Sequence, residues 1–233
     1  MARFWSSDRR QFVNNLPWLA EEKQPRLCDR SLATAVLFDQ CPGGRLETAV
    51  RTLAECPAEM GFSYPCNAGW RLWALARGGR ADVIVEDLRR RWATMTSVIE
   101  NNTLQEDWEA RHDAGQQWSH CAVAPLYVTY HGLAGIRPLA PGFARMEIRP
   151  QLGDLSELAL TAHTVRGPVR FAARGQPGDR ELRLAVPDGC EAELLVRREE
   201  QVPLEPAPAR APAGHLRYRL PGGTETVLHL RHA

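Results

Sequence analysis

The chain has 233 residues, and its 29 basic and 28 acidic side chains leave a formal net charge of +1. This balance lacks the excess of Lys and Arg that is typical of nucleic-acid binding, and no apolar run approaches the ~18 residues that a membrane span needs. The first residues (MARFWSSDRR) contain no apolar segment of the kind found in a secretory signal. With 44% hydrophobic and 24% charged residues, the composition predicts a folded cytoplasmic protein without a nucleic-acid or membrane partner.

The first part of the chain has a helical apolar period. Amphipathic helices are predicted over residues 31–41, 45–56, 66–77, 80–92 and 120–133. Ser31 and Ser119 precede apolar runs and are expected to cap the first and last of these helices. Short Gly and Pro turns separate the segments, which predicts a series of helical hairpins.

From residue 143 onward the apolar period changes to two. Alternating apolar residues between Gly and Pro turns predict about seven strands that form an antiparallel β-sandwich. Residues 201–212 hold four prolines and are expected to form an extended surface loop. The predicted architecture is therefore helical over residues 1–137 and β-rich over residues 138–233.

The six cysteines are scattered and include no Cys-x-x-Cys pair. They are expected to be reduced thiols packed as small apolar residues rather than a disulfide framework. The alternative is a metal site formed by His112, Asp113, His120 and Cys121, but their spacing matches no recognised zinc pattern. We therefore predict no metal site.

The segment from Asn101 to His120 has the greatest density of chemically capable side chains. It carries carboxylates (among them Glu106), amides (among them Asn102), two imidazoles and the indoles of Trp108 and Trp118. Aromatic faces stack on sugar rings, amides bind hydroxyl groups, and a carboxylate can accept a proton from water. The structural alternatives are a solvated acidic connection, a structural His120, and partly buried tryptophan anchors.

The order of these motifs resembles the C-terminal end of bacterial α-L-rhamnosidases, glycoside hydrolase family 78. The matching residues are 103–108 (TLQEDW), Ser119-His120, and 134–143 (AGIRPLAPGF) leading into 146–150 (MEIRP). The resemblance implies a partial (α/α)6 toroid of helical hairpins over residues 1–137, followed by a C-terminal β-sandwich domain. It also implies a carbohydrate substrate, an inverting two-carboxylate mechanism and no cofactor.

Position by position, the resemblance implies that Glu106 is the catalytic carboxylate that activates water. It places Asn102, Trp108, Trp118 and His120 as substrate-binding residues. The family's usual aromatic residue before this carboxylate is Gln105 here.

The family's general-acid motif, which is rich in Asp, Arg, Gly and Trp, has no match in residues 1–65, and five helices cannot close a toroid of twelve. The expectation is therefore a fragment that lacks the N-terminal portion of the enzyme and is inactive by itself. Uncovered hairpins would leave an apolar patch exposed, with Trp70, Trp73, Val85 and Leu88 as candidates. The alternative function is a non-catalytic carbohydrate-binding or interaction module.

Overall fold

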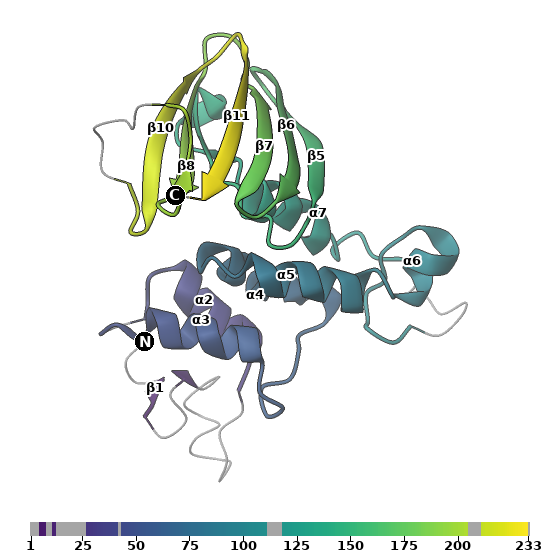
Figure 1. Ribbon diagram of the computed structural model, residues 1–233. Helices are drawn as coiled ribbons and strands as arrows, with labels where there is room; N and C mark the ends of the chain where they lie inside the picture. The colour runs from purple at the N-terminus through teal and green to yellow at the C-terminus, as the bar shows by residue number, and fades with distance from the viewer. Residues whose placement is uncertain are drawn as a thin grey trace. The chain divides into compact units, whose positions relative to one another are not determined.

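The computed structural model describes residues 5–7, 11–12, 27–41, 43–110, 118–204 and 211–232, and the chain divides into two compact units (Figure 1). We call Met1–Val128 the helical unit and Thr129–Ala233 the β unit. In the described part of the chain, no helix is long and apolar enough to cross a membrane.

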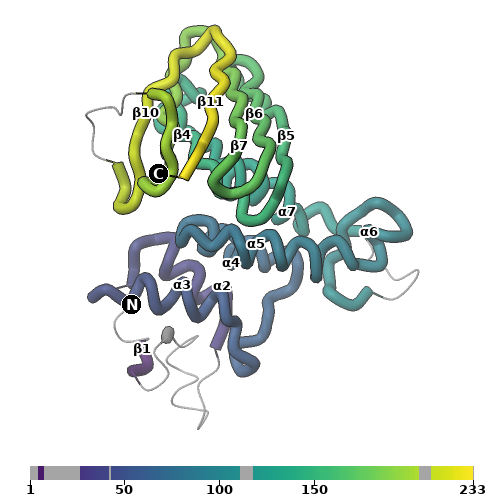
Figure 2. Tube along the Cα trace, viewed as in Figure 1, coloured from purple at the N-terminus to yellow at the C-terminus, as the bar shows by residue number. Residues whose placement is uncertain are grey.

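The helical unit contains the predicted helices as a set of short packed segments. They are α2 (Asp29–Leu37), α3 (Arg45–Glu55), α4 (Pro65–Arg77), α5 (Ala81–Asp87), η2 (Leu88–Trp92), α6 (Thr96–Asn101) and α7 (Ala124–Val128). Helix α4 packs against α2, α3, α5 and α7, and Figure 2 traces the chain from α5 out to α6. Two short strands, β1 (Trp5–Ser6) and β2 (Gln11–Phe12), pair antiparallel, and the apolar periodicity does not anticipate them or α6.

The predicted caps Ser31 and Ser119 do not lie at helix starts. Helix α2 begins at Asp29, two residues before Ser31, and its N-cap is Cys28. Helix α7 begins at Ala124 rather than near His120. A helix beginning at residue 120 would place Pro125 in its interior, where proline has no N–H to donate and clashes with the preceding turn. The side-chain oxygen of Ser119 instead accepts a hydrogen bond from the backbone N–H of Ala122 (3.2 Å), within a non-helical segment.

The predicted helix over residues 80–92 is helical from Ala81 to Trp92 but changes its winding. Helix α5 continues directly into the π-helical turn η2, where the N–H of Ala93 donates to the carbonyl of Leu88 (2.9 Å). Of the four residues expected on an exposed patch, Trp70 and Trp73 are 36% and 42% exposed, and Leu88 is half-buried. The expectation for Val85 is wrong, because α5 turns Val85 inward together with Ile84.

The β unit is a two-sheet sandwich, and the seven predicted strands are confirmed. One sheet has the order β10-β8-β4-β3, and the other has the order β5-β6-β7-β11-β9. The strands are β3 (Arg137–Pro138), β4 (Arg145–Ile148), β5 (Glu157–Thr164), β6 (Gly167–Gln176), β7 (Asp179–Ala185), β8 (Glu191–Arg197), β9 (Glu200–Gln201), β10 (His215–Pro221) and β11 (Glu225–His232). The alternating apolar residues are buried, among them Met146, Phe171, Leu184, Leu194 and Leu230. Because alternate residues of a strand point to opposite faces, each sheet contributes one apolar face to the core.

Two details of the sandwich differ from the expectation. Strand β4 pairs with β8 in parallel, whereas the other strand pairs are antiparallel among the described residues. Parallel neighbours need a crossover connection, and here β5, β6 and β7 of the other sheet supply it. In addition, Gln201 belongs to β9, which pairs with β11, so the expected loop over residues 201–212 does not begin at residue 201. Residues 205–210 of that expected loop lie outside the described residues.

The units meet between Val128 and Thr129, earlier in the chain than the change of apolar period. The helical turn η4 (Thr129–Leu133) follows α7 directly but is hydrogen-bonded within the β unit. The hydroxyl of Tyr130 donates to the carbonyl of Thr161 (3.3 Å), and the backbone N–H of Gln151 donates to the carbonyl of Leu133 (2.8 Å). Tertiary hydrogen bonds therefore assign this turn to the β unit, although its sequence is helical in character.

Candidate functional site

The loop that carries Glu106 is shaped by the side chain of Gln105. Helix α6 ends at Asn101, and Asn102 then adopts the left-handed conformation (φ 53°), which asparagine tolerates better than most residues. Gln105 is completely buried. Its carbonyl oxygen accepts hydrogen bonds from the backbone N–H (3.1 Å) and hydroxyl (2.9 Å) of Ser97.

The amide nitrogen of Gln105 donates to the carbonyls of Asp107 (2.8 Å) and Trp108 (3.0 Å). The backbone on both sides of Glu106 is therefore held by one buried side chain, and the Glu106 side chain is exposed. Sequence reasoning noted Gln105 only as a departure from the family pattern. A buried amide that uses both its acceptor and its donors can be identified only when its neighbours are known.

Trp108 is half-buried and anchors the same loop. Its indole N–H donates to the carbonyl of Ser63 (2.8 Å), and its ring meets Trp92 edge-on with a centroid separation of 5.2 Å. The guanidinium of Arg91 lies over the Trp108 ring at 4.9 Å and over the Phe62 ring at 3.2 Å. These contacts occupy the indole N–H and part of the ring surface. They correspond to the anchoring role that we considered for Trp108 as the alternative to sugar binding.

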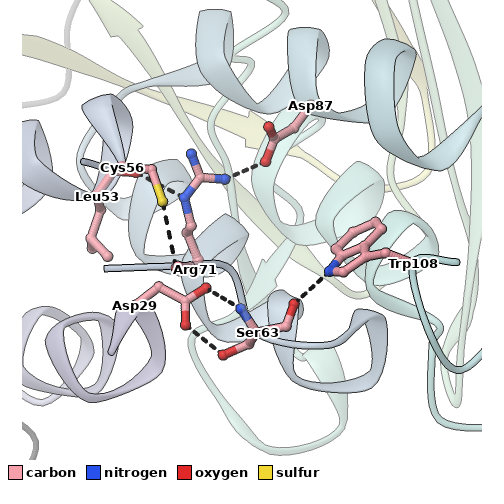
Figure 3. A network of polar contacts seen from close by, with 8 residues as sticks. Asp29, Leu53, Cys56, Ser63, Arg71, Asp87 and Trp108 are labelled. Carbon is pink, nitrogen blue, oxygen red and sulfur yellow. Dashed lines mark hydrogen bonds and ion pairs between the residues drawn. The ribbon is translucent and has the colours of Figure 1, made fainter. Parts of the chain in front are cut away.

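Ser63, which holds Trp108, is itself held by a buried carboxylate of α2. Asp29 is 2% exposed and accepts hydrogen bonds from the hydroxyl and the backbone N–H of Ser63, the latter at 3.1 Å (Figure 3). In the same view, Arg71 of α4 donates to the carbonyl of Leu53 (2.8 Å) and forms an ion pair with Asp87. Polar contacts thus connect α2 to the segment that positions Trp108, and they join α4 to α3 and α5. Neither Asp29 nor Ser63 was identified from the sequence as part of the site.

The segment Trp118, Ser119 and His120 lies beside the Glu106 loop. The backbone N–H of Ser119 donates to the carbonyl of Leu104 (3.0 Å), two residues before Glu106. Trp118 is 61% exposed, and the side chain of His120 is exposed. This hydrogen bond brings together two of the sequence motifs across a connection, residues 111–117, that lies outside the described residues.

The start of α4 lies within electrostatic reach of Glu106. Burial raises the pKa of the Cys66 thiol, and the neighbouring Cys121 and the Glu106 carboxylate raise that pKa further. Asn102 is exposed at the end of α6, where its backbone N–H donates to the carbonyl of Val98 (3.2 Å). The exposed carboxylate of Glu106 can accept a proton from water, and the exposed indole of Trp118 can contact a polar ring.

No group of three or more His, Cys, Asp or Glu side chains is placed to hold a metal ion in the part of the chain that the structure describes. Two members of the alternative metal set, His112 and Asp113, lie outside the described residues.

Comparison with known proteins shows what the chain is similar to. Residues 135–206 match the model of the bacterial alpha-L-rhamnosidase C-terminal domain, and no curated protein matches the chain. An alpha-L-rhamnosidase of Streptomyces avermitilis, solved with L-rhamnose, is 19% identical with a TM-score of 0.65, over 86% of this chain and 21% of its own length. An alpha-L-rhamnosidase of Dictyoglumus thermophilum is 18% identical with a TM-score of 0.67, over 87% of this chain and 25% of its own length.

A rhamnosidase of family GH78 from Bacillus sp. GL1 is 18% identical with a TM-score of 0.59, over 74% of this chain and 19% of its own length. This chain therefore spans about a fifth to a quarter of the length of these proteins, and at these identities the likeness concerns the fold. Residues 135–206 therefore match the bacterial alpha-L-rhamnosidase C-terminal domain, and over most of its length the chain has the fold of the matching part of these α-L-rhamnosidases.

Proposed function

We propose that this chain is the C-terminal part of an inverting glycoside hydrolase that acts on terminal α-L-rhamnosyl residues. Residues 1–137 would be the last hairpins of an (α/α)6 toroid, and residues 138–233 the β-sandwich domain that follows it. The observation that carries the proposal is the exposed Glu106 on a loop that the buried Gln105 holds, together with the backbone hydrogen bond that joins Ser119 to Leu104 of the same loop. The family match and the fold likeness support the rhamnoside as substrate.

In this proposal Glu106 is the general base. Its carboxylate takes a proton from a water molecule, which attacks the anomeric carbon from the face opposite the leaving group. Asn102, Trp108, Trp118 and His120 would contact the sugar, with Trp108 also serving as the anchor described above. Two carboxylates suffice for this reaction, so no cofactor is needed.

The carboxylic acid that protonates the leaving oxygen would come from the portion of the enzyme that precedes this chain. Inverting enzymes separate their two carboxyl groups by about 6.5–9.5 Å, so this portion would have to cover the Glu106 face. The 233-residue chain alone is then expected to show no turnover.

The test is Glu106→Gln in the enzyme that includes this preceding portion, with an aryl α-L-rhamnoside as substrate. The amide keeps the size of the side chain but cannot accept the proton, and loss of a general base lowers the rate by about 10²–10⁴-fold. Glu109→Gln is the matched control, because it removes another exposed carboxylate from the same loop. Circular dichroism shows whether either variant remains folded.

Unchanged turnover in folded Glu106→Gln, or an equal loss in Glu109→Gln, would contradict the assignment of Glu106. Turnover by the 233-residue chain alone would contradict the location of the acid. Binding of L-rhamnose by the wild-type enzyme without any hydrolysis would instead support the non-catalytic carbohydrate-binding module.

A further inference from the structure

The outer face of the four-stranded sheet β10-β8-β4-β3 is rich in arginine. Side chains alternate between the two faces of a strand, and the core residues of β4, β8 and β10 mark the inner face. On the outer face, Arg137 of β3 lies opposite Glu147 of β4, and Glu147 lies opposite Glu193 of β8. Glu193 in turn lies opposite Arg219 of β10. Strands that are far apart in the sequence therefore contribute to one charged layer.

Positive charge exceeds negative charge on this outer face. It carries three glutamates, Glu147, Glu191 and Glu193, against six arginines, which leaves an excess of three positive charges. Arg149 belongs to the layer because it directly follows β4 and its N–H donates to the carbonyl of Gly135 (3.2 Å), which continues the pairing of β4 with β3. We call this surface the arginine face, and its arginines are Arg137, Arg145, Arg149, Arg197, Arg217 and Arg219.

The outer face of the other sheet shows that this excess is local. There, four arginines on β6, β7 and β11 are matched by four acidic residues on β5, β7 and β11. Ion pairs join the two signs, such as Arg174 with Glu157 (2.8 Å) and Arg183 with Glu181 (2.6 Å). Because the whole chain has a net charge of only +1, the excess is a property of the arginine face.

The carboxylates of the arginine face do not suffice for its guanidinium groups. Glu193 is shared between Arg217 (3.1 Å) and Arg145 (3.7 Å). Arg197 and Arg219 are exposed and form no ion pair with any residue that the structure describes. Exposed guanidinium groups on neighbouring strands are thus available to an external anion.

Arg149 is paired with a neutral group. Its Nε–H donates to Nε2 of His215 (3.3 Å), so Nδ1 of this ring carries the proton and donates to the carbonyl of Ala213 (3.0 Å). Burial lowers the pKa of Arg149, and the like charge of Arg137 lowers it further. A bound anion would offset this crowding of positive charge.

We propose that the arginine face binds a polysaccharide whose sugar residues carry carboxylate groups. A guanidinium group can bind a carboxylate through two parallel N–H···O bonds, which favours arginine over lysine for this task. Neighbouring strands lie about 4.8 Å apart, so the four strands span roughly 14 Å and can contact several carboxylates of one extended chain. The choice of a polysaccharide rests on the proposed function, because a glycoside hydrolase encounters polymeric carboxylates as acidic sugars.

The chemistry of the face argues against other partners. A single-stranded nucleic acid is bound with the help of aromatic side chains that stack on its bases. Among the described residues, the outer face of this sheet carries no Phe, Tyr or Trp, and Tyr218 of β10 is buried on the inner side. A neutral glycan would leave the excess of positive charge without a counterpart.

The experiment measures binding of the full 233-residue chain to polygalacturonate by isothermal titration calorimetry. The control ligand is fully methyl-esterified polygalacturonate, which has the same sugar backbone but no charge. We expect binding of the acid form only. Raising the salt from about 0.01 M to about 0.15 M shortens the Debye length from about 30 Å to about 8 Å, and we expect the affinity to fall by about tenfold or more. Equal binding of the ester, or an affinity that salt does not change, would overturn the proposal.

Matched double variants locate the binding surface. Replacing Arg197 and Arg219 by glutamine removes two exposed charges from the arginine face and is expected to weaken binding by about tenfold. Replacing Arg170 and Arg231 by glutamine lowers the net charge equally on the outer face of the other sheet, and binding should stay within about twofold of the wild type. Circular dichroism confirms that both variants are folded. Equal losses in the two variants would overturn the proposal, because binding would then follow net charge alone.

A further ligand and the catalytic test separate the remaining outcomes. Tighter binding of single-stranded oligothymidylate than of polygalacturonate would overturn the polysaccharide in favour of a nucleic acid. Absence of binding to polygalacturonate would reject the arginine face and leave the assignment of Glu106 in place. Binding that is lost in the Arg197 and Arg219 variant would support the arginine face even if Glu106→Gln left turnover unchanged.

Discussion

Replacing Gln105 by leucine tests whether one buried amide holds the Glu106 loop. Leucine has a similar volume but can neither accept nor donate a hydrogen bond. The substitution therefore removes four hydrogen bonds, two accepted from Ser97 and two donated to the carbonyls of Asp107 and Trp108.

The expected cost follows from the burial of the groups left behind. Ser97 is fully buried, so its backbone N–H and its hydroxyl lose their shared acceptor in a place that water does not reach. A buried donor without a partner costs about 1–3 kcal/mol, which gives roughly 2–6 kcal/mol for the pair. Asp107 and Trp108 are only half-buried, and hydration of their carbonyls makes the remaining loss small. We expect the free energy of unfolding of the helical unit to fall by this amount.

Tryptophan fluorescence during urea denaturation measures this change selectively. All seven tryptophans precede residue 129, so the signal reports on the helical unit and not on the β unit. Ser97→Ala is the matched partner variant, because it removes the hydroxyl that Gln105 accepts from. In a double-mutant cycle the effect of Ser97→Ala should be smaller in the Gln105→Leu background than in the wild type. A Gln105→Leu protein within about 0.5 kcal/mol of the wild type, or strictly additive effects, would refute this reasoning.

Two further predictions concern the β unit. Gly135→Ala should destabilise it by about 2–5 kcal/mol, because φ at this position is +70° and the added methyl group would collide with the backbone of Arg149. The control Gly189→Ala has a similar φ of +69° but open space around it, so it should cost only the backbone strain of about 1 kcal/mol. Hydrogen exchange of β4 and β8 distinguishes the two variants, and equal effects would contradict the contact. Burial, and then the nearby Arg149, lower the pKa of His215 below 6.5, so the unfolded chain takes up the proton first and stability is lost as the pH falls below about 6.5. Thermal melting of the β unit between pH 5 and 8 should show this loss and His215→Asn should reduce it; identical pH profiles would count against it.

Apolar periodicity determined most of the secondary structure. The period of two after residue 143 predicted all seven long strands, because alternate residues of a half-buried strand must face the core. Helices α3 and α4 begin and end within about one residue of their predicted limits, because apolar residues that recur with a period of 3.6 lie on one face of a helix and that face packs into the core. The periodic pattern failed at helix starts: Pro125 places the start of α7 at Ala124, and α2 begins at Asp29 although its N-cap Cys28 makes no side-chain cap hydrogen bond.

Only the tertiary structure decided how distant segments are placed together. A local pattern records which face of an element is apolar, but it contains no information on which distant group will meet a polar side chain. The clasp of Gln105, the Asp29–Ser63–Trp108 contacts and the parallel pairing of β4 with β8 all join such segments. Glu106 could be named from the sequence because of a family resemblance, and its role stays a prediction. The residues that hold its loop could not be named, because a buried polar side chain is satisfied by partners that only the folded chain supplies.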